Sequence, residues 1–118
     1  MSVSHNDFTI HSGLTSDVLL AQAQQYSVSE YRRMTLALHQ VPSTGNTFKA
    51  DVTIYGSVKD DVNWFTEITT KSLSTASETI DHIDIATIYP GRVLRYLKIV
   101  ISNVSDGYLD IHLATSRY

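Results

Sequence analysis

Apolar and polar residues alternate along most of this chain, and this period of two constrains the fold more than any other feature of the sequence. Successive side chains of a β-strand point to opposite faces, so alternation predicts strands that bury one face and expose the other. The pattern is clearest at residues 8–10, 34–38, 50–54 and 109–113. Each of these segments is therefore predicted to be a half-buried strand.

Three further segments fit strands less regularly. Residues 64–69 follow a turn rich in Asp and Asn, and in residues 78–85 the isoleucines break strict alternation. A bulge near Asp81 would restore the register of the second segment. Residues 93–101 are almost continuously apolar or β-branched, which indicates a central strand covered on both faces.

Turn residues separate these strands. Pro90 and Gly91 interrupt the chain before the central strand. Asp106 and Gly107 both tolerate a positive φ, so this pair predicts a tight hairpin between the last two strands.

Residues 16–25 admit two interpretations. Ser16 is a good helix N-cap and the residues after it favour a helix of two turns. An isolated helix this short is marginal and the flanking segments are strands, so we favour a strand and keep the helix as the alternative. The chain then has about eight strands, which predicts an all-β fold, a two-sheet antiparallel β-sandwich with a jelly roll as the candidate topology.

The expected core follows from the inward positions of these strands. A chain of 118 residues can bury such a core without disulfides or a structural metal. We therefore expect one β-sandwich domain over residues 1–118, with residues 1–13 as a candidate extended N-terminal arm. The residues expected to be buried together are Leu36, Val52, Ile54, Leu97, Ile99, Leu109 and Ile111.

Composition excludes several functional classes. The chain has no cysteine, so zinc-ribbon and thiol chemistry are ruled out. It has 9 Lys and Arg against 12 Asp and Glu, a net charge of -3 and no basic run, which argues against nucleic-acid binding. No stretch resembles a signal peptide or a membrane span, so we expect no membrane partner and synthesis in a cytoplasm.

The sequence also gives no sign of catalysis. It has no nucleophile elbow, phosphate loop or zincin motif, so we expect no enzyme, no catalytic or metal site and no cofactor. His82 and Asp84 fall on one face of a strand, but two ligands do not complete a metal site. Asp60 and Asp61 fit ordinary turn chemistry, with a calcium loop as the alternative.

Aromatic residues are the more informative group. The chain has seven tyrosines, and tyrosine is enriched both at protein contacts and in β-sheets, which composition alone does not separate. The aromatic residues expected to bind a partner are Phe8, Tyr26, Tyr31, Tyr89 and Tyr96.

One stretch resembles a known structural element. Residues 51–65 read as a strand that ends in Gly-Ser, an acidic turn and then Asn-Trp. This hairpin is similar to those of small β-sandwich proteins of tailed-phage virions and, more weakly, of discoidin-like, galactose-binding-type domains. In the phage proteins, segments similar to residues 29–38 and 90–99 precede and follow the hairpin. The absence of a Cys pair differs from extracellular discoidin domains and suits a virion protein.

The resemblance implies a non-enzymatic structural protein of a tailed bacteriophage, made in the host cytoplasm and located in the virion. Its role would be capsid decoration, or that of an accessory subunit of the head, neck or tail. Its partners would be other virion proteins, such as the major capsid or tail proteins. A homo-oligomer bound to a repeating protein lattice is expected.

The alternative function is that of a carbohydrate-binding module. An exposed Trp64 would then stack on a sugar ring while Asp60, Asp61 and Asn63 bind its hydroxyl groups. The direction of the Trp64 side chain separates the two functions, since an inward indole is a core residue and an outward indole is a sugar platform. We expect it to point inward.

Overall fold

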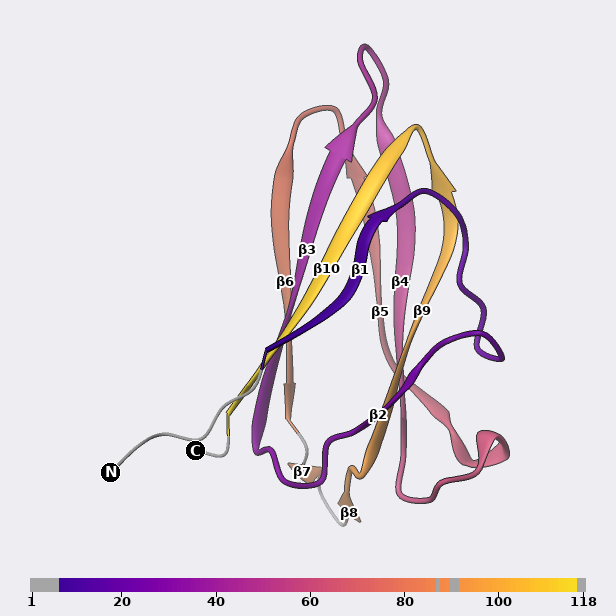
Figure 1. Cartoon of the computed structure of the whole chain (residues 1–118), viewed down its shortest axis with the longest axis vertical. Coiled ribbons are helices and arrows are strands. Elements are labelled where there is room, and N and C mark those ends of the chain that lie inside the picture. The colour runs from indigo at the N-terminus through magenta and orange to yellow at the C-terminus, as the bar shows by residue number, and fades with distance from the viewer. Residues whose placement is uncertain (1–6, 87, 90–91, 117–118) are drawn as a thin grey trace.

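The computed structural model describes residues 7–86, 88–89 and 92–116, which form two four-stranded antiparallel sheets packed face to face (Figure 1). No helix in this part of the chain has the length and apolar character to cross a membrane. Sheet A contains, in spatial order, β1 (Asp7–Leu14), β10 (Gly107–Ser116), β3 (Arg33–Pro42) and β6 (Thr79–Ala86). Sheet B contains β2 (Gln25–Ser27), β9 (Tyr96–Ser105), β4 (Phe48–Ser57) and β5 (Thr66–Thr75). A separate ribbon pairs β7 (Ile88–Tyr89) with β8 (Arg92–Val93), and a 3-10 helix, η1, covers Val62–Trp64.

The strand order is that of a jelly roll. Without the β7–β8 ribbon, eight strands remain, and numbered consecutively they run 1-8-3-6 in sheet A and 2-7-4-5 in sheet B. Among the described strands of these two sheets, only β4 and β5 are both consecutive in the chain and paired with each other. The other connections cross between the sheets. The predicted all-β sandwich is confirmed.

The two sheets bury one continuous apolar core. All seven residues expected there are at most 2% exposed, so that prediction is confirmed. The alternation is regular in β3, β4 and β10, where every second residue is buried over most of the strand. In β9, Leu97, Lys98 and Ile99 are buried in succession, as expected for a central strand covered on both faces.

The last two strands do not form the predicted hairpin. Asp106 and Gly107 do adopt positive φ angles of 61° and 156°. However, β9 pairs with β2 and β4 whereas β10 pairs with β1 and β3, so this turn carries the chain from sheet B to sheet A. A side chain on Gly107 would lie 2.3 Å from the carbonyl oxygen of Val41. The conformation of the turn was predictable from its residues, but the strand that pairs with the returning chain was not.

The predicted bulge near Asp81 is also wrong. Pairing between β3 and β6 runs without a shift from Arg33 and Ala86 to Gln40 and Thr79. Regular pleating turns Asp81 toward the inner face, where it accepts a 2.8 Å hydrogen bond from buried Gln40. The same pleating leaves Ile80 outward and 57% exposed.

Three predicted boundaries shift. In residues 16–25 neither a continuous strand nor a two-turn helix forms, because Val18 makes a single bridge to Ile101 and one turn closes at Ala23. Trp64 belongs to η1, so β5 starts at Thr66 rather than at residue 64. Residues 7–13 of the expected arm lie in β1, paired with β10, whereas residues 1–6 and the turn at 90–91 lie outside the described residues.

Burial at the centre of β9 leads to a stability prediction. Leu97→Ala should lower the free energy of unfolding by about 2–5 kcal/mol, because it removes a fully buried side chain and leaves a cavity. Leu19→Ala, at a 55% exposed position, is the matched control and should change it by less than about 0.5 kcal/mol. Urea unfolding followed by circular dichroism measures both. Equal effects of the two variants would contradict the placement of β9 in the core.

Candidate functional site

The connection between β4 and β5 brings together three exposed large apolar side chains. We call residues 58–65 the Trp64 loop; it projects at the lower right of Figure 1. Val58, Val62 and Trp64 are 40%, 50% and 51% exposed. The expectation that Trp64 points inward is therefore wrong. The adjacent Phe65 takes the buried position, and the 3-10 turn leaves the indole on the outside.

Hydrogen bonds within and around the Trp64 loop fix its shape. The Oδ1 atom of Asp61 caps η1 by accepting the backbone N–H of Asn63 at 2.9 Å. The Oδ1 atom of Asp60 accepts Nε2–H of Gln25 at 2.8 Å, which ties the loop to β2. Sequence reasoning identified Asp60, Asp61, Asn63 and Trp64 as one group, and they do share this loop. Each carboxylate, however, already has one oxygen engaged in holding it.

A hollow of about 270 Å³ lies beside the indole. The ammonium of Lys59 lies 4.9 Å from the centre of the Trp64 ring, within cation–π range. A side chain on Gly56 would come within 2.5 Å of Leu94 and Ile68, so only glycine allows these residues to pack there. The residues that line the hollow are Gly56, Ser57, Val58, Trp64, Thr66 and Leu94. This arrangement can hold an apolar or aromatic group against the indole.

The aromatic residues expected to bind a partner are dispersed. Phe8 and Tyr26 are half-buried and pack together with ring centroids 5.8 Å apart, and burial raises the pKa of Tyr26. Tyr96 is half-buried in β9. Tyr31 is in the core, so its assignment as a contact residue is wrong. Tyr89 lies in β7, and its side chain is outside the described structure.

Sequence reasoning missed two members of the exposed apolar group. Val58 and Val62 read as ordinary loop residues, because they stand among polar neighbours and outside any alternating segment. Their only signal in the sequence is that both lie within six residues of the tryptophan.

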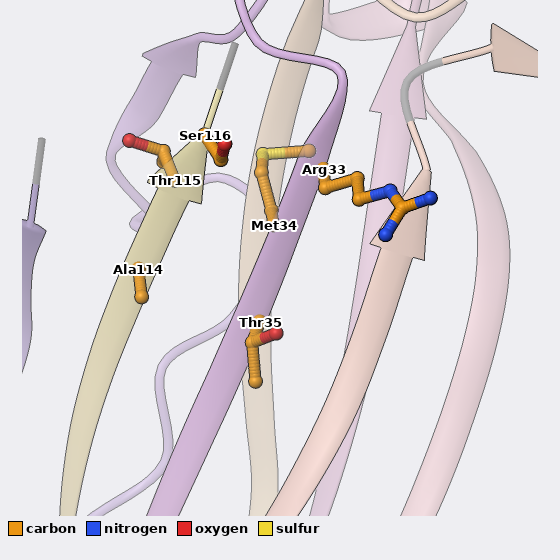
Figure 2. Close-up of a pocket in the computed structure, with 6 residues that line it drawn as sticks. All are labelled: Arg33, Met34, Thr35, Ala114, Thr115 and Ser116. Carbon is orange, nitrogen blue, oxygen red and sulfur yellow. The ribbon is translucent and has the colours of Figure 1, made fainter. Parts of the chain in front are cut away.

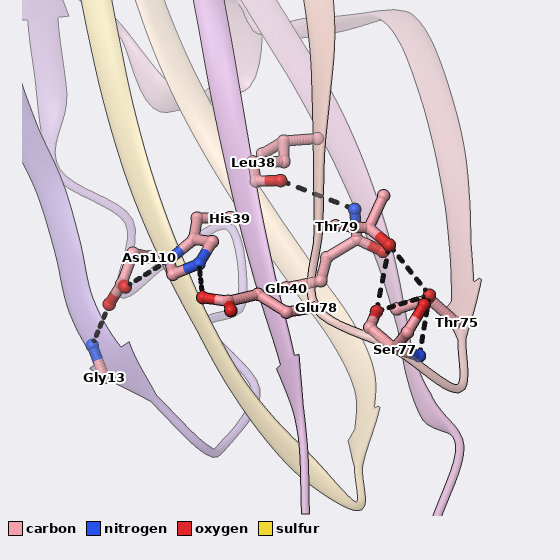
Figure 3. A network of polar contacts seen from close by, with 9 residues as sticks. All are labelled: Gly13, Leu38, His39, Gln40, Thr75, Ser77, Glu78, Thr79 and Asp110. Atoms are coloured by element: carbon pink, nitrogen blue, oxygen red, sulfur yellow. Dashed lines mark hydrogen bonds and ion pairs between the residues drawn. The ribbon is translucent and has the colours of Figure 1, made fainter.

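A polar network crosses the outer face of sheet A (Figure 3). His39 on β3 contacts Asp110 on β10 at 2.9 Å through Nδ1, and Glu78 at 2.6 Å through Nε2. The other oxygen of Asp110 accepts the backbone N–H of Gly13 at 2.7 Å. We call His39, Glu78 and Asp110 the His39 clip, because with Gly13 it joins β1, β10, β3 and the start of β6.

The clip shifts the pKa of two of its members. Its hydrogen bonds to Asp110 and Glu78 raise the pKa of His39 above 6.5. The Gly13 N–H, and then His39, lower the pKa of Asp110.

The pair noted in the sequence, His82 and Asp84, shares this outer face but stands apart from the clip. Asp84 accepts a 2.9 Å hydrogen bond from the hydroxyl of Thr35 on the neighbouring strand. No three His, Asp or Glu side chains are arranged to hold a metal ion in the described part of the chain.

Another hollow, of about 330 Å³, lies beside the start of β3 and the end of β10 (Figure 2). Its lining is Arg33, Met34, Thr35, Ala114, Thr115 and Ser116, and Figure 2 shows the guanidinium of Arg33 pointing away from β10. The lining includes neither a histidine nor a carboxylate, the groups most used in acid–base catalysis.

Comparison with known proteins gives a similarity of fold and no similarity of sequence. No protein-family model matches the sequence, and no curated protein sequence matches it. The crystal structure of the SPBc2 prophage-derived protein YomS is similar, with a TM-score of 0.59 over 98% of this chain and 96% of that chain. The two sequences are 13% identical, so this likeness shows the fold alone.

The His39 clip predicts a pH-dependent contribution to stability. Because folding raises the pKa of His39, its contribution is fully present below pH 6.5 and is lost as the pH rises through the folded pKa. The side chain of His39 is 29% exposed, so solvent screening limits the contribution to about 1 kcal/mol. His39→Gln should thus destabilise the protein more at about pH 5.5 than at about pH 8.5, on either side of the ordinary histidine pKa. Urea unfolding at both pH values measures this.

His82→Gln is the matched control for this prediction. His82 lies exposed on the same face, and no hydrogen bond of its side chain is present in the described structure. The control should cost less than His39→Gln at about pH 5.5, because it removes no such hydrogen bonds. A loss from His39→Gln that does not depend on pH would contradict the clip as a charged interaction.

Proposed function

We propose that the protein is a non-enzymatic structural component of a tailed-phage particle, a capsid decoration or accessory subunit that binds a repeating lattice of virion proteins. The observation that carries the proposal is the match of fold to a prophage-derived protein along nearly the whole of both chains. The hairpin of residues 51–65, which resembles those of virion sandwiches, is independent support from the sequence.

The Trp64 loop is the contact surface we assign to this role. Tryptophan is enriched at protein–protein interfaces. Val58 and Val62 belong to the same loop and are also exposed, so they add to its apolar surface. The loop is already held by the Asp61 cap and by the bond from Gln25 to Asp60. Binding therefore costs little ordering of the loop.

Many copies acting together can make a small contact sufficient. On a repeating lattice, a homo-oligomer engages several identical sites, so that modest affinities multiply when the geometry allows simultaneous binding. A contact centred on one loop fits this mode better than a single interface of standard size. The proposed location is the virion, after synthesis in the host cytoplasm.

The second candidate is a carbohydrate-binding module, which the outward direction of Trp64 favours. Lys59 lies over the indole ring, so a sugar would displace this ammonium or use the opposite ring face. Asn63 is exposed at the same loop and can bind a hydroxyl group.

The virion proposal predicts that Trp64→Ala combined with Val62→Ser reduces co-sedimentation of the purified protein with particles of the source phage. Each lost apolar anchor should weaken a contact by about tenfold, because such residues contribute on the order of 1–2 kcal/mol. Ile80→Ser is the matched control, since Ile80 is similarly exposed but lies on sheet A. Full binding by the double variant would remove the Trp64 loop as the contact surface.

The carbohydrate candidate predicts a different result for Trp64 alone. On an array of bacterial surface glycans, Trp64→Ala should lose binding and Trp64→Phe should retain it, because stacking requires a ring. Glycan binding that follows this pattern, with no affinity for any virion protein, would replace the virion proposal. An array without signal for the unmodified protein would remove the candidate.

A further inference from the structure

A small cavity lies at the side of the sandwich where β1 and β2 are the edge strands of their sheets. The opposite edge strands of the two sheets are β6 and β5. The volume of the cavity is about 180 Å³. The segment that connects β1 to β2 contributes to its wall, and buried Ile99 of β9 lies at its inner end. The lining residues are Ile10, His11, Val18, Gln22, Gln24, Tyr26 and Ile99.

The polar lining has unused hydrogen-bonding capacity. In the described structure the side chains of His11 and Gln24 make no hydrogen bond to the protein. Gln22 uses Oε1 to accept the backbone N–H of Leu19 at 3.2 Å, and its Nε2 donates to no group of the described residues. Burial lowers the pKa of His11, so its neutral ring offers one donor and one acceptor near pH 7.

The other half of the lining is apolar and well held. Ile10, Val18 and Ile99 supply aliphatic surface. Tyr26 adds an aromatic ring whose position is fixed by the tilted contact with Phe8, at an interplanar angle of 59°. One ring of a ligand can therefore rest on apolar surface while its edge faces amide and imidazole groups.

The lining selects against two classes of ligand. It contains no Lys, Arg, Asp or Glu, so an ionic ligand would lose its hydration without gaining an opposite charge. His11 is half-buried, so a purely apolar ligand would shield its imidazole from water and leave it without a partner, which is costly. A neutral ring that carries hydroxyl groups satisfies both halves. An apolar cavity of about 150 Å³ accommodates a benzene ring, so this volume has room for the six-membered ring of a sugar, with its substituents extending past the exposed Gln22 and Gln24.

We propose that this cavity binds a neutral monosaccharide ring, with its apolar face on Tyr26 and the aliphatic residues and its hydroxyl groups on Gln22, Gln24 and His11. The site is separate from the Trp64 loop. Sugar binding in this cavity does not depend on attachment to a phage particle. The cavity is a second binding site in addition to the Trp64 loop.

The test is a titration of the ¹⁵N-labelled full chain with methyl α-D-glucopyranoside, methyl α-D-galactopyranoside and N-acetylglucosamine, followed by NMR. At least one sugar should shift the amide signals of Gln24, Tyr26 and Ile99, with a dissociation constant in the millimolar range expected for a ligand of this size. Absence of shifts with all three sugars at about 50 mM would overturn the proposal.

Two variants locate the binding. Val18→Phe should abolish it by filling the cavity, and Gln24→Ala should weaken it about fivefold, the effect of one lost hydrogen bond. Gln24 is exposed, so its variant keeps the test valid even where Val18→Phe fails to fold. Trp64→Ala is the control and should bind as the unmodified protein does. Loss of binding in Trp64→Ala with no effect of Gln24→Ala would overturn the proposal, as would binding of benzene in preference to the sugars.

Discussion

Burial of one face of each sheet against the other is the constraint on which the rest of the structure depends. Leu36, Leu38 and Ile111 of sheet A are fully buried, and they stay inside only if the pleat of each strand keeps its register. Because consecutive strands mostly belong to different sheets, the chain crosses the margin of the core at nearly every turn. The connection from β4 to β5 stays within one sheet, and this is the connection that carries the exposed indole.

Side-chain hydrogen bonds join neighbouring strands on the outer faces of both sheets, and two loops also cover part of the outer face of sheet B. On sheet A, side chains bond across neighbouring strands, as in the His39 clip. On sheet B, two loops cover the outer face above Lys98, whose ammonium donates to the carbonyl of Leu20 at 3.3 Å and lies 5.3 Å from the centre of the Phe65 ring. The bond from Gln25 to Asp60 joins β2 to the Trp64 loop. The Trp64 loop and the segment between β1 and β2 are therefore anchored to the same lysine.

The features that depend on the local alternation of apolar and polar residues were predictable from the sequence. Period two identified the buried faces of β3, β4, β9 and β10, because one face of a half-buried strand must be apolar. It failed at Trp64 and Phe65, since either of two adjacent apolar residues can take the buried position, and Phe65 is buried over Lys98 on the outer face of sheet B. It also failed at Asp81, whose partner Gln40 lies 41 residues away. The His39 clip and the small cavity join distant strands, and alternation specifies the faces of a strand but not its neighbours.

The internal bonds of the Trp64 loop bear on which partner it suits. Sugar recognition relies on polar groups at the edge of the stacked ring, and carboxylates serve this role when their oxygens are free to accept from hydroxyl groups. Asp60 and Asp61 each use one oxygen to hold the loop, and Lys59 lies over the ring. The loop therefore presents the apolar surface of Trp64 and its two valines beside exposed Lys59, Asp60 and Asn63. An apolar patch edged by polar side chains is suited to a complementary protein surface, where burial of the indole excludes water and the surrounding contacts need only fit.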